Sequence, residues 1–145
     1  MPPVIRPAHP ADGAAVVELW QECGLIVSHN DPRADFTFAL TGVASCVLVA
    51  EDRERRLVGS VMVGHDGHRG WLYYLAVASG CRGRGFGRAL VTAAEDWLRE
   101  CHVPKVQLLV RDTNVAVVGF YEGLGFATAQ SVVMGKWLRS PGREE

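Results

Sequence analysis

The residues best suited to chemistry lie in one short segment, Arg82-Gly-Arg-Gly-Phe-Gly-Arg88, between an expected strand and an expected amphipathic helix. A turn at a helix start exposes unpaired backbone N–H groups and the positive end of the helix dipole, and both attract phosphate oxygens. Its glycines let the backbone approach a ligand closely, because no Cβ stands in the way. Its three arginines add positive charge. The segment predicts a phosphate-binding turn.

Other phosphate motifs fit the sequence less well. No G-x-x-x-x-G-K-[ST] pattern occurs, which disfavours a P-loop kinase or ATPase. A dinucleotide fingerprint would place its glycines after an early strand, whereas this turn comes late and follows a hairpin. A glycine-rich helix start that binds nothing is the remaining alternative to the phosphate-binding turn.

Asn114 and Tyr121 form a second arrangement, because they lie seven residues apart on one short expected helix. Seven residues at about 100° each return to nearly the same face, roughly 10 Å along the axis. One helix face can therefore present both side chains to one extended ligand. The alternative for Tyr121 is a half-buried ring that packs and hydrogen-bonds a carbonyl group.

The elements that must position these residues follow from hydrophobic periodicity and turn signals. They predict an α/β (α+β) fold with a mixed central sheet of about six strands, flanking helices, and the order β-α-α-β-β-β-α-β-α-β. Asp12 is the expected N-cap of the first helix and Gly24 its stop. Strands are expected at 4–6, 45–50, 57–63, 71–77, 105–111 and 131–138, and helices at 9–23, 35–40, 86–101 and 114–123.

Length and composition predict one domain over residues 1–139, with a polar tail at 140–145. The formal net charge of −1 argues against a nucleic-acid binder, and no apolar run reaches membrane-spanning length. The four cysteines are widely spaced and form no C-x-x-C pair, so we expect free thiols in a reducing cytoplasm.

Two segments resemble the hallmarks of the GNAT acetyltransferase superfamily. Leu75-Ala-Val77 followed by Arg82-x-x-Gly85-x-Gly87 is similar to its acetyl-CoA motif, [QR]-x-x-G-x-[GA]. Asn114 with Phe120-Tyr-Glu-Gly-Leu-Gly-Phe126 is similar to its second hallmark, N-x-x-A-x-x-[FL]-Y-x-x-x-G-F, with Val117 in place of the alanine. The expected order of elements agrees with the GNAT acyl-CoA N-acyltransferase fold across nearly the whole chain.

Three further segments resemble the YpeA-type branch of that superfamily: Gly64-x-Asp-Gly-His-Arg-Gly70, Tyr73-Tyr-Leu75 and Asn30-Asp-Pro32. The resemblance implies a V-shaped splay between the parallel strands at 71–77 and 105–111, with the pantetheine arm in the opening. It implies acetyl-CoA as co-substrate and Tyr121 as the catalytic general acid for the departing thiolate. The contacts it implies with acetyl-CoA are made by Leu75, Ala76, Val77, Arg82, Gly83, Arg84, Gly85, Phe86, Gly87, Arg88 and Asn114.

The general base is not assigned by the sequence. Many relatives carry a glutamate on the strand before the glycine-rich turn, but residues 71–77 contain no carboxylate. Proton removal through water, or binding of the neutral fraction of the amine, stays open. His65 and His68 could be read as a metal pair, but without a third ligand no metal is expected. The residues left open as bases are His29, Asp31, His65, Asp66, His68, Tyr73 and Tyr74.

The sequence therefore predicts an N-acetyltransferase that moves an acetyl group from acetyl-CoA to a primary amine by direct attack in a ternary complex. A small-molecule acceptor is favoured. One alternative is a protein N-terminal α-amine acetyltransferase, and another is a non-catalytic acyl-CoA sensor. No nucleic-acid or membrane partner is expected, and a homodimer stays open because it is common among relatives of the family.

Overall fold

The computed structural model describes residues 2–139 and forms two compact units, with the division between Leu108 and Leu109. The single domain predicted for 1–139 stays a prediction, and the predicted tail at 140–145 lies outside the described residues. The second unit contains one helix, α4 (Val115–Glu122). The first unit contains, in chain order, β1 (Val4–Pro7), a 3₁₀ turn η1 (Pro10–Asp12), α1 (Gly13–Glu22), α2 (Pro32–Thr41), β2 (Ser45–Glu51), β3 (Leu57–His65), β4 (Gly70–Val77), a 3₁₀ turn η2 (Ser79–Cys81), α3 (Phe86–Glu100) and β5 (Val106–Leu108).

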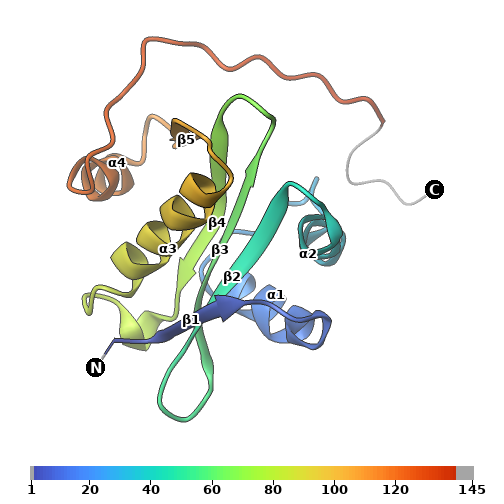
Figure 1. Cartoon of the computed structure of the whole chain (residues 1–145), viewed down its shortest axis with the longest axis vertical. Helices are drawn as coiled ribbons and strands as arrows, with labels where there is room; N and C mark the ends of the chain where they lie inside the picture. Colours follow the sequence, from blue (N-terminus) through green and yellow to red (C-terminus); the bar gives the residue numbers. More distant parts are fainter. Residues whose placement is uncertain (1, 140–145) are drawn as a thin grey trace. The chain divides into compact units, whose positions relative to one another are not determined.

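The sheet of the first unit has the strand order β1-β2-β3-β4-β5. Its first three pairings are antiparallel, and β4 pairs with β5 in parallel. Helix α3 packs on one face of this sheet, and α1 and α2 pack on the other (Figure 1). The predicted mixed sheet flanked by helices is confirmed, with five strands in place of about six.

The helix predicted at 9–23 forms as α1 and buries one apolar face. Val16 and Trp20 are 0% exposed and Leu19 is 6% exposed, and all three belong to the core between α1, α2 and β2. Asp12 occupies the N-cap position of α1, as predicted, but its side chain makes no capping hydrogen bond. Its carboxylate accepts hydrogen bonds from Arg6 and from the backbone N–H of His9 instead.

Helix α2 begins three residues before the predicted start at Asp35. Oδ1 of Asp31 accepts hydrogen bonds from the backbone N–H groups of Arg33 and Ala34, each at 3.1 Å. Asp31 is therefore the N-cap, and Pro32 occupies the first helical position, where its missing N–H is not needed. Hydrophobic periodicity does not reveal this start, because the residues that mark it, Asp31 and Pro32, are not part of an apolar pattern.

The predicted strand at 131–138 is absent from the structure, and that prediction is wrong. Val132, Met134 and Leu138 are 87%, 91% and 94% exposed, and no sheet ladder includes them. A β-branched, apolar sequence suits a strand only where a second strand supplies partners, and α4 is the only regular element among the described residues of this unit, 109–139. The strand predicted at 105–111 is likewise shorter, because β5 pairs over three residues only.

Within residues 2–139, none of the helices has both the length and the apolar character needed to cross a bilayer. The cysteines Cys23, Cys46, Cys81 and Cys101 are free thiols, each half-buried.

Candidate active site

The glycine-rich turn ends at the N-terminus of α3 and presents free backbone donors. Gly83 and Gly85 have φ angles of +80° and +81°, which a side chain with a Cβ adopts only under strain. The first helical hydrogen bond of α3 runs from Ala89 N to Gly85 O at 3.0 Å. The N–H groups of residues 86–88 therefore have no helical carbonyl to bind. A Cβ built on Gly83 or Gly85 would meet no atom within 4 Å, so the space beside both glycines is open.

The three arginines of the turn do different things. Arg82 folds back onto the end of β4, where its Nε donates to Val77 O at 3.1 Å and its Nη2 lies 3.5 Å from Cys23 Sγ. Arg82 therefore braces the turn against the sheet. Arg84 and Arg88 are exposed, so their charges remain available to an anion.

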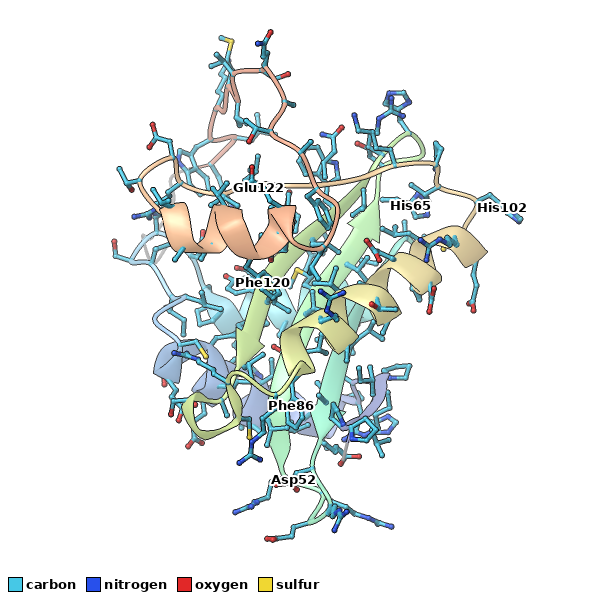
Figure 2. The ribbon with its side chains drawn as sticks, turned by 90° about the vertical axis from the view of Figure 1, so that its left-hand side faces the viewer. Asp52, His65, Phe86, His102, Phe120 and Glu122 are labelled. Atoms are coloured by element: carbon cyan, nitrogen blue, oxygen red, sulfur yellow. The ribbon has the colours of Figure 1, made fainter. Side chains whose placement is uncertain are left out.

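Phe86 anchors the start of α3 from inside the core. Its side chain is only 6% exposed, and Figure 2 shows it at the first turn of the helix. The ring therefore fixes the position of the turn, while the part of Phe86 that faces a ligand is its backbone N–H. Its predicted contact with acetyl-CoA is a main-chain contact in this geometry.

Strand β4 has a free edge beyond its short pairing with β5. The parallel register runs from Gly70 opposite Val106 to Leu72 opposite Leu108 and then stops. Within residues 2–139, no strand pairs with 73–77 on that side. The backbone of Leu75–Val77 is thus available for an extended ligand to add to the sheet edge. The V-shaped splay that the resemblance implied stays a prediction.

A β-bulge distorts β4 at the same place. Tyr73 pairs with Met62 and Ala76 pairs with Ser60, so Tyr74 and Leu75 together stand opposite Val61 alone. Tyr74 has a φ angle of +54°, which is strained for a residue with a bulky side chain. Bulges re-aim side chains and interrupt the ladder, and they concentrate near active sites. No sequence signal announced this one, since neither residue is a glycine.

The bulge turns Tyr74 towards α1 and α2, where its side chain is held on two sides. Its ring stacks on Trp20 with a centroid distance of 3.9 Å and an interplanar angle of 11°. Its hydroxyl group donates a 2.7 Å hydrogen bond to Oδ2 of Asp35. Loss of hydration and the hydrogen bond to Asp35 raise the pKa of Tyr74 far above its usual value, although a hydrogen bond from Asn30 opposes them. The hydroxyl group of Tyr74 therefore keeps its proton at neutral pH and is not suited to act as a base.

Tyr73, the neighbouring candidate, lies in a different environment. Its side chain is 46% exposed, and burial together with the charge of Asp66 raises the pKa of its hydroxyl group. A raised pKa makes a phenol a poorer base at neutral pH, so neither tyrosine of β4 is suited to remove a proton from an amine.

Two of the other candidate bases, Asp66 and His65, accept hydrogen bonds within the hairpin turn. Oδ1 of Asp66 accepts hydrogen bonds from the backbone N–H groups of His68 and Arg69, at 2.9 and 2.7 Å. These bonds, that from Arg69 first, lower the pKa of Asp66. Nδ1 of His65 accepts from Gly67 N at 3.1 Å. The Asp-Gly hairpin predicted from the sequence is confirmed, and these side chains stabilise it.

The second unit holds Asn114 and Tyr121. The carboxamide oxygen of Asn114 caps α4 by accepting from Val117 N at 3.4 Å. The ring of Tyr121 makes edge contacts with Phe120 and Phe126, at centroid distances of 5.0 and 5.4 Å. Loss of hydration raises the pKa of Tyr121 to about 12. This phenol therefore stays protonated at neutral pH and can donate a proton.

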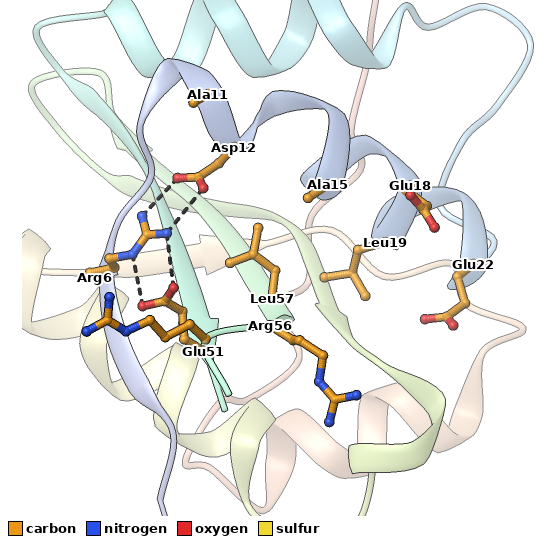
Figure 3. Close-up of a pocket in the computed structure, with 11 residues that line it drawn as sticks. Arg6, Ala11, Asp12, Ala15, Glu18, Leu19, Glu22, Glu51, Arg56 and Leu57 are labelled. Carbon is orange, nitrogen blue, oxygen red and sulfur yellow. Dashed lines mark hydrogen bonds and ion pairs between the residues drawn. The ribbon is translucent and has the colours of Figure 1, made fainter. Parts of the chain in front are cut away.

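One hollow of the first unit has none of the predicted site residues in its wall. It encloses about 590 Å³, and the guanidinium group of Arg6 spans one side of it between Asp12 and Glu51 (Figure 3). These contacts tie β1 and β2 to the start of α1, which is a structural role. A smaller hollow of about 270 Å³ lies beside the glycine-rich turn and includes Arg84 and Phe86 in its wall. Among residues 2–139, no three His, Cys, Asp or Glu side chains are grouped to hold a metal ion.

The model of the acetyltransferase (GNAT) family matches residues 13–126 of this sequence. The chain belongs to this family. The family predicted from the two motifs is therefore confirmed, and the protein is an enzyme of the acetyl-CoA-dependent N-acetyltransferase class.

Relatives and solved structures agree with this GNAT membership. An acetyltransferase of Yersinia enterocolitica is 42% identical over 134 residues, which cover 92% of this chain and 94% of the relative. A putative acetyltransferase from Agrobacterium tumefaciens has a TM-score of 0.77 at 22% identity, covering 92% of this chain and 99% of that one. AAC(6′)-Iy, in complex with the bisubstrate analog CoA-S-monomethyl-acetylneamine, has a TM-score of 0.81 at 16% identity, covering 94% and 99%. The two structures are similar to this GNAT chain in fold.

The sequence did not identify Asp35, Trp20 and Ser60 as neighbours of the β4 bulge. Trp20 was expected in the core, and Asp35 was expected only as the start of a helix. Their link to Tyr74 depends on the positive φ of that residue, which turns its side chain towards α1 and α2. A non-glycine residue in the left-handed region carries no reliable sequence signal.

Proposed function

We propose that this GNAT enzyme transfers the acetyl group of acetyl-CoA to a primary amine by direct attack within a ternary complex. The observation that carries the proposal is the open turn at the start of α3, whose free N–H groups adjoin the free edge of β4. A diphosphate needs the first feature, and an extended amide-bearing arm can use the second.

The turn supplies the grip on the diphosphate. The N–H groups of residues 83–88 point at it, and the exposed guanidinium groups of Arg84 and Arg88 add charge. Arg82 holds the turn against the end of β4 through its hydrogen bond to Val77 O. Leu75, Ala76 and Val77 offer backbone groups to the pantetheine arm, and the carboxamide nitrogen of Asn114 offers a further donor, because the helix cap uses only the oxygen.

The thioester then lies at the β4 bulge. An amine that attacks its carbonyl carbon creates a negative oxygen, which a backbone N–H near Leu75 or Ala76 stabilises where the ladder is interrupted. The carbon–sulfur bond breaks, and the thiolate accepts a proton from the hydroxyl group of Tyr121 as the general acid. The nitrogen of the new amide releases its extra proton to water, and water returns a proton to Tyr121. With a pKa of about 12, Tyr121 still holds that proton at neutral pH.

A small-molecule amine is the acceptor that we favour. A glucosamine-6-phosphate N-acetyltransferase and an aminoglycoside acetyltransferase are among the structures of similar fold, at 21% and 17% identity, and they support this choice. A protein N-terminal α-amine is the alternative within the enzyme class. A non-catalytic acyl-CoA sensor is the alternative outside it, motivated by the absence of a carboxylate on β4. A cytoplasmic location and a homodimeric assembly remain part of the proposal.

Two measurements test the proposed function. Calorimetric titration with acetyl-CoA measures binding, and release of free CoA thiol measures turnover against a panel of monoamines, polyamines, amino sugars and short peptides. Binding with turnover of free amines supports the proposal, and preference for peptides supports the N-terminal alternative. Binding without any turnover supports the sensor. Absence of acetyl-CoA binding would overturn all three.

A further inference from the structure

The carboxylate of Asp35 is placed at the β4 bulge by α2. Its Oδ2 accepts the 2.7 Å hydrogen bond from Tyr74, and its side chain is half-buried. The Asn30 side chain, in the loop before α2, bonds the same tyrosine. Asn30, Asp35 and Tyr74 therefore connect the 24–31 loop, α2 and β4 at one point.

In the part of the chain that the structure describes, no arginine or lysine side chain forms an ion pair with Asp35. The ion pairs of residues 2–139 use the guanidinium groups of Arg6, Arg56 and Arg99. A partly dehydrated carboxylate that has a single hydroxyl donor keeps much of its desolvation cost. Its second oxygen, Oδ1, is the atom left for a positively charged ligand.

The position of the Asp35 carboxylate relative to the free edge of β4 indicates a function for its charge. Tyr74 directly precedes Leu75–Val77, the stretch along which we place the pantetheine arm. The bulge and the positive φ of Tyr74 turn its hydroxyl group away from that stretch, towards α1 and α2. A ligand held by Asp35 would thus approach the thioester from the α1–α2 side.

We propose that Asp35 binds the ammonium form of the acceptor amine, and that Tyr74 positions the Asp35 carboxylate for this contact. The inference rests on the proposed function and narrows it to acceptors with a cationic amine. The strained Tyr74 and its stack on Trp20 hold the carboxylate at a fixed place, so that the ammonium group meets a preorganised charge. The proton leaves the amine before attack, to water or to Asp35 Oδ1.

The competing explanation is that Asp35 only ties α2 to the sheet. Asp35→Asn separates the two roles, because an asparagine oxygen still accepts the Tyr74 hydrogen bond while the charge is lost. A tether would survive this change, whereas a charge-based contact with an ammonium group would not.

The experiment uses the full chain and the best acceptor amine from the panel above. For Asp35→Asn we expect the KM for the amine to rise at least about tenfold, with the affinity for acetyl-CoA and the thermal midpoint little changed. Glu18→Gln is the matched control, since it removes one exposed carboxylate from α1, a helix on the same side of the sheet. We expect this control to keep the wild-type KM.

Tyr74→Phe tests the positioning role. It keeps the ring that stacks on Trp20 and removes only the hydroxyl group, so we expect a smaller rise in KM, of about threefold to tenfold. In the double variant with Asp35→Asn the two effects should be less than additive, because the hydroxyl group acts through the carboxylate.

Failure of this inference can be distinguished from failure of the proposed function. Turnover of amines by the wild type, with an unchanged KM in Asp35→Asn, would overturn this inference and leave the proposed function standing. An equal rise in KM for Glu18→Gln would also overturn it, because the effect would then be one of general charge. If the wild type acetylates no amine, both fail together.

Discussion

The indole nitrogen of Trp20 donates a 3.0 Å hydrogen bond to the hydroxyl oxygen of Ser60, and both residues are 0% exposed. The same indole ring stacks on Tyr74. The buried hydrogen bond between Trp20 of α1 and Ser60 of β3 therefore fixes the ring on which Tyr74 stacks. Tyr74 in turn bonds Asp35. This chain of contacts couples the stability of the first unit to the geometry of the bulge.

Ser60→Ala should lower the free energy of unfolding by about 1–3 kcal/mol, because it leaves a buried indole N–H without an acceptor. Urea denaturation followed by tryptophan fluorescence measures this loss. Thr41→Ala is the control: its exposed hydroxyl group bonds only to the preceding turn, at Thr37 O. A change below about 0.5 kcal/mol is expected there. Equal losses in the two variants would contradict the role given to the Trp20–Ser60 bond.

Tyr121→Phe should reduce kcat by about a hundredfold or more while leaving the affinity for acetyl-CoA within about twofold, since a general acid acts in the transition state. Phe120→Leu, on the adjacent helix position, is a packing control that keeps the acid. Loss of acetyl-CoA binding in Tyr121→Phe, or unchanged turnover, would remove Tyr121 from the mechanism.

The pH dependence of kcat gives a separate test of the same residue. The raised pKa of Tyr121, about 12, means that the phenol keeps its proton until the pH approaches that value. Between pH 7 and pH 10 we therefore expect no fall in kcat from loss of this acid. A descending limb that disappears in Tyr121→Phe and has its midpoint below pH 10 would show that the phenol titrates near its ordinary pKa.

Gly85→Ala should weaken acetyl-CoA binding by about tenfold, because an alanine strains the φ of +81° and adds a Cβ on the ligand side of the turn. Gly80→Ala is the matched control in the neighbouring 3₁₀ turn: its added Cβ also meets no atom within 4 Å, and its φ lies outside the left-handed region. Calorimetry and thermal unfolding on both variants separate lost affinity from lost stability. Equal affinities in the two variants would contradict the phosphate-binding role of the turn.

Asp12→Asn should destabilise the first unit by about 1–2 kcal/mol at pH 7, because the carboxylate bonds Arg6 and is only 15% exposed. The hydrogen bond from Arg6 lowers the pKa of Asp12 in the folded state. Its contribution is therefore complete above the unfolded pKa of about 3.9 and is lost as the pH falls through the lower folded value.

The difference in unfolding free energy between wild type and Asp12→Asn should shrink below about pH 4. Asp96→Asn removes an exposed partner of Arg99 and should cost less than about 0.5 kcal/mol at any pH. A difference for Asp12→Asn that stays constant from pH 7 to pH 3 would contradict the ion-pair account.

The sequence by itself determined the family, the order of the elements up to α4 and the glycine-rich turn at the start of α3, because each depends on local chemistry. Glycines at a helix start, apolar spacing along α1 and α3, and the Asn114–Tyr121 pattern are visible in short windows of residues. The Asp66–Gly67 hairpin belongs to the same group, since its hydrogen bonds lie within four residues.

The tertiary structure alone decided which strands found partners and which side chains meet. The 131–138 segment has the composition of a strand, but a ladder also needs a second edge, and no short window specifies one. Asp35 and Tyr74 lie 39 residues apart, and their contact requires a bulge with a positive φ at a non-glycine residue. Local propensity disfavours that conformation; the packing of Tyr74 on Trp20, contributed by another element, holds it in place.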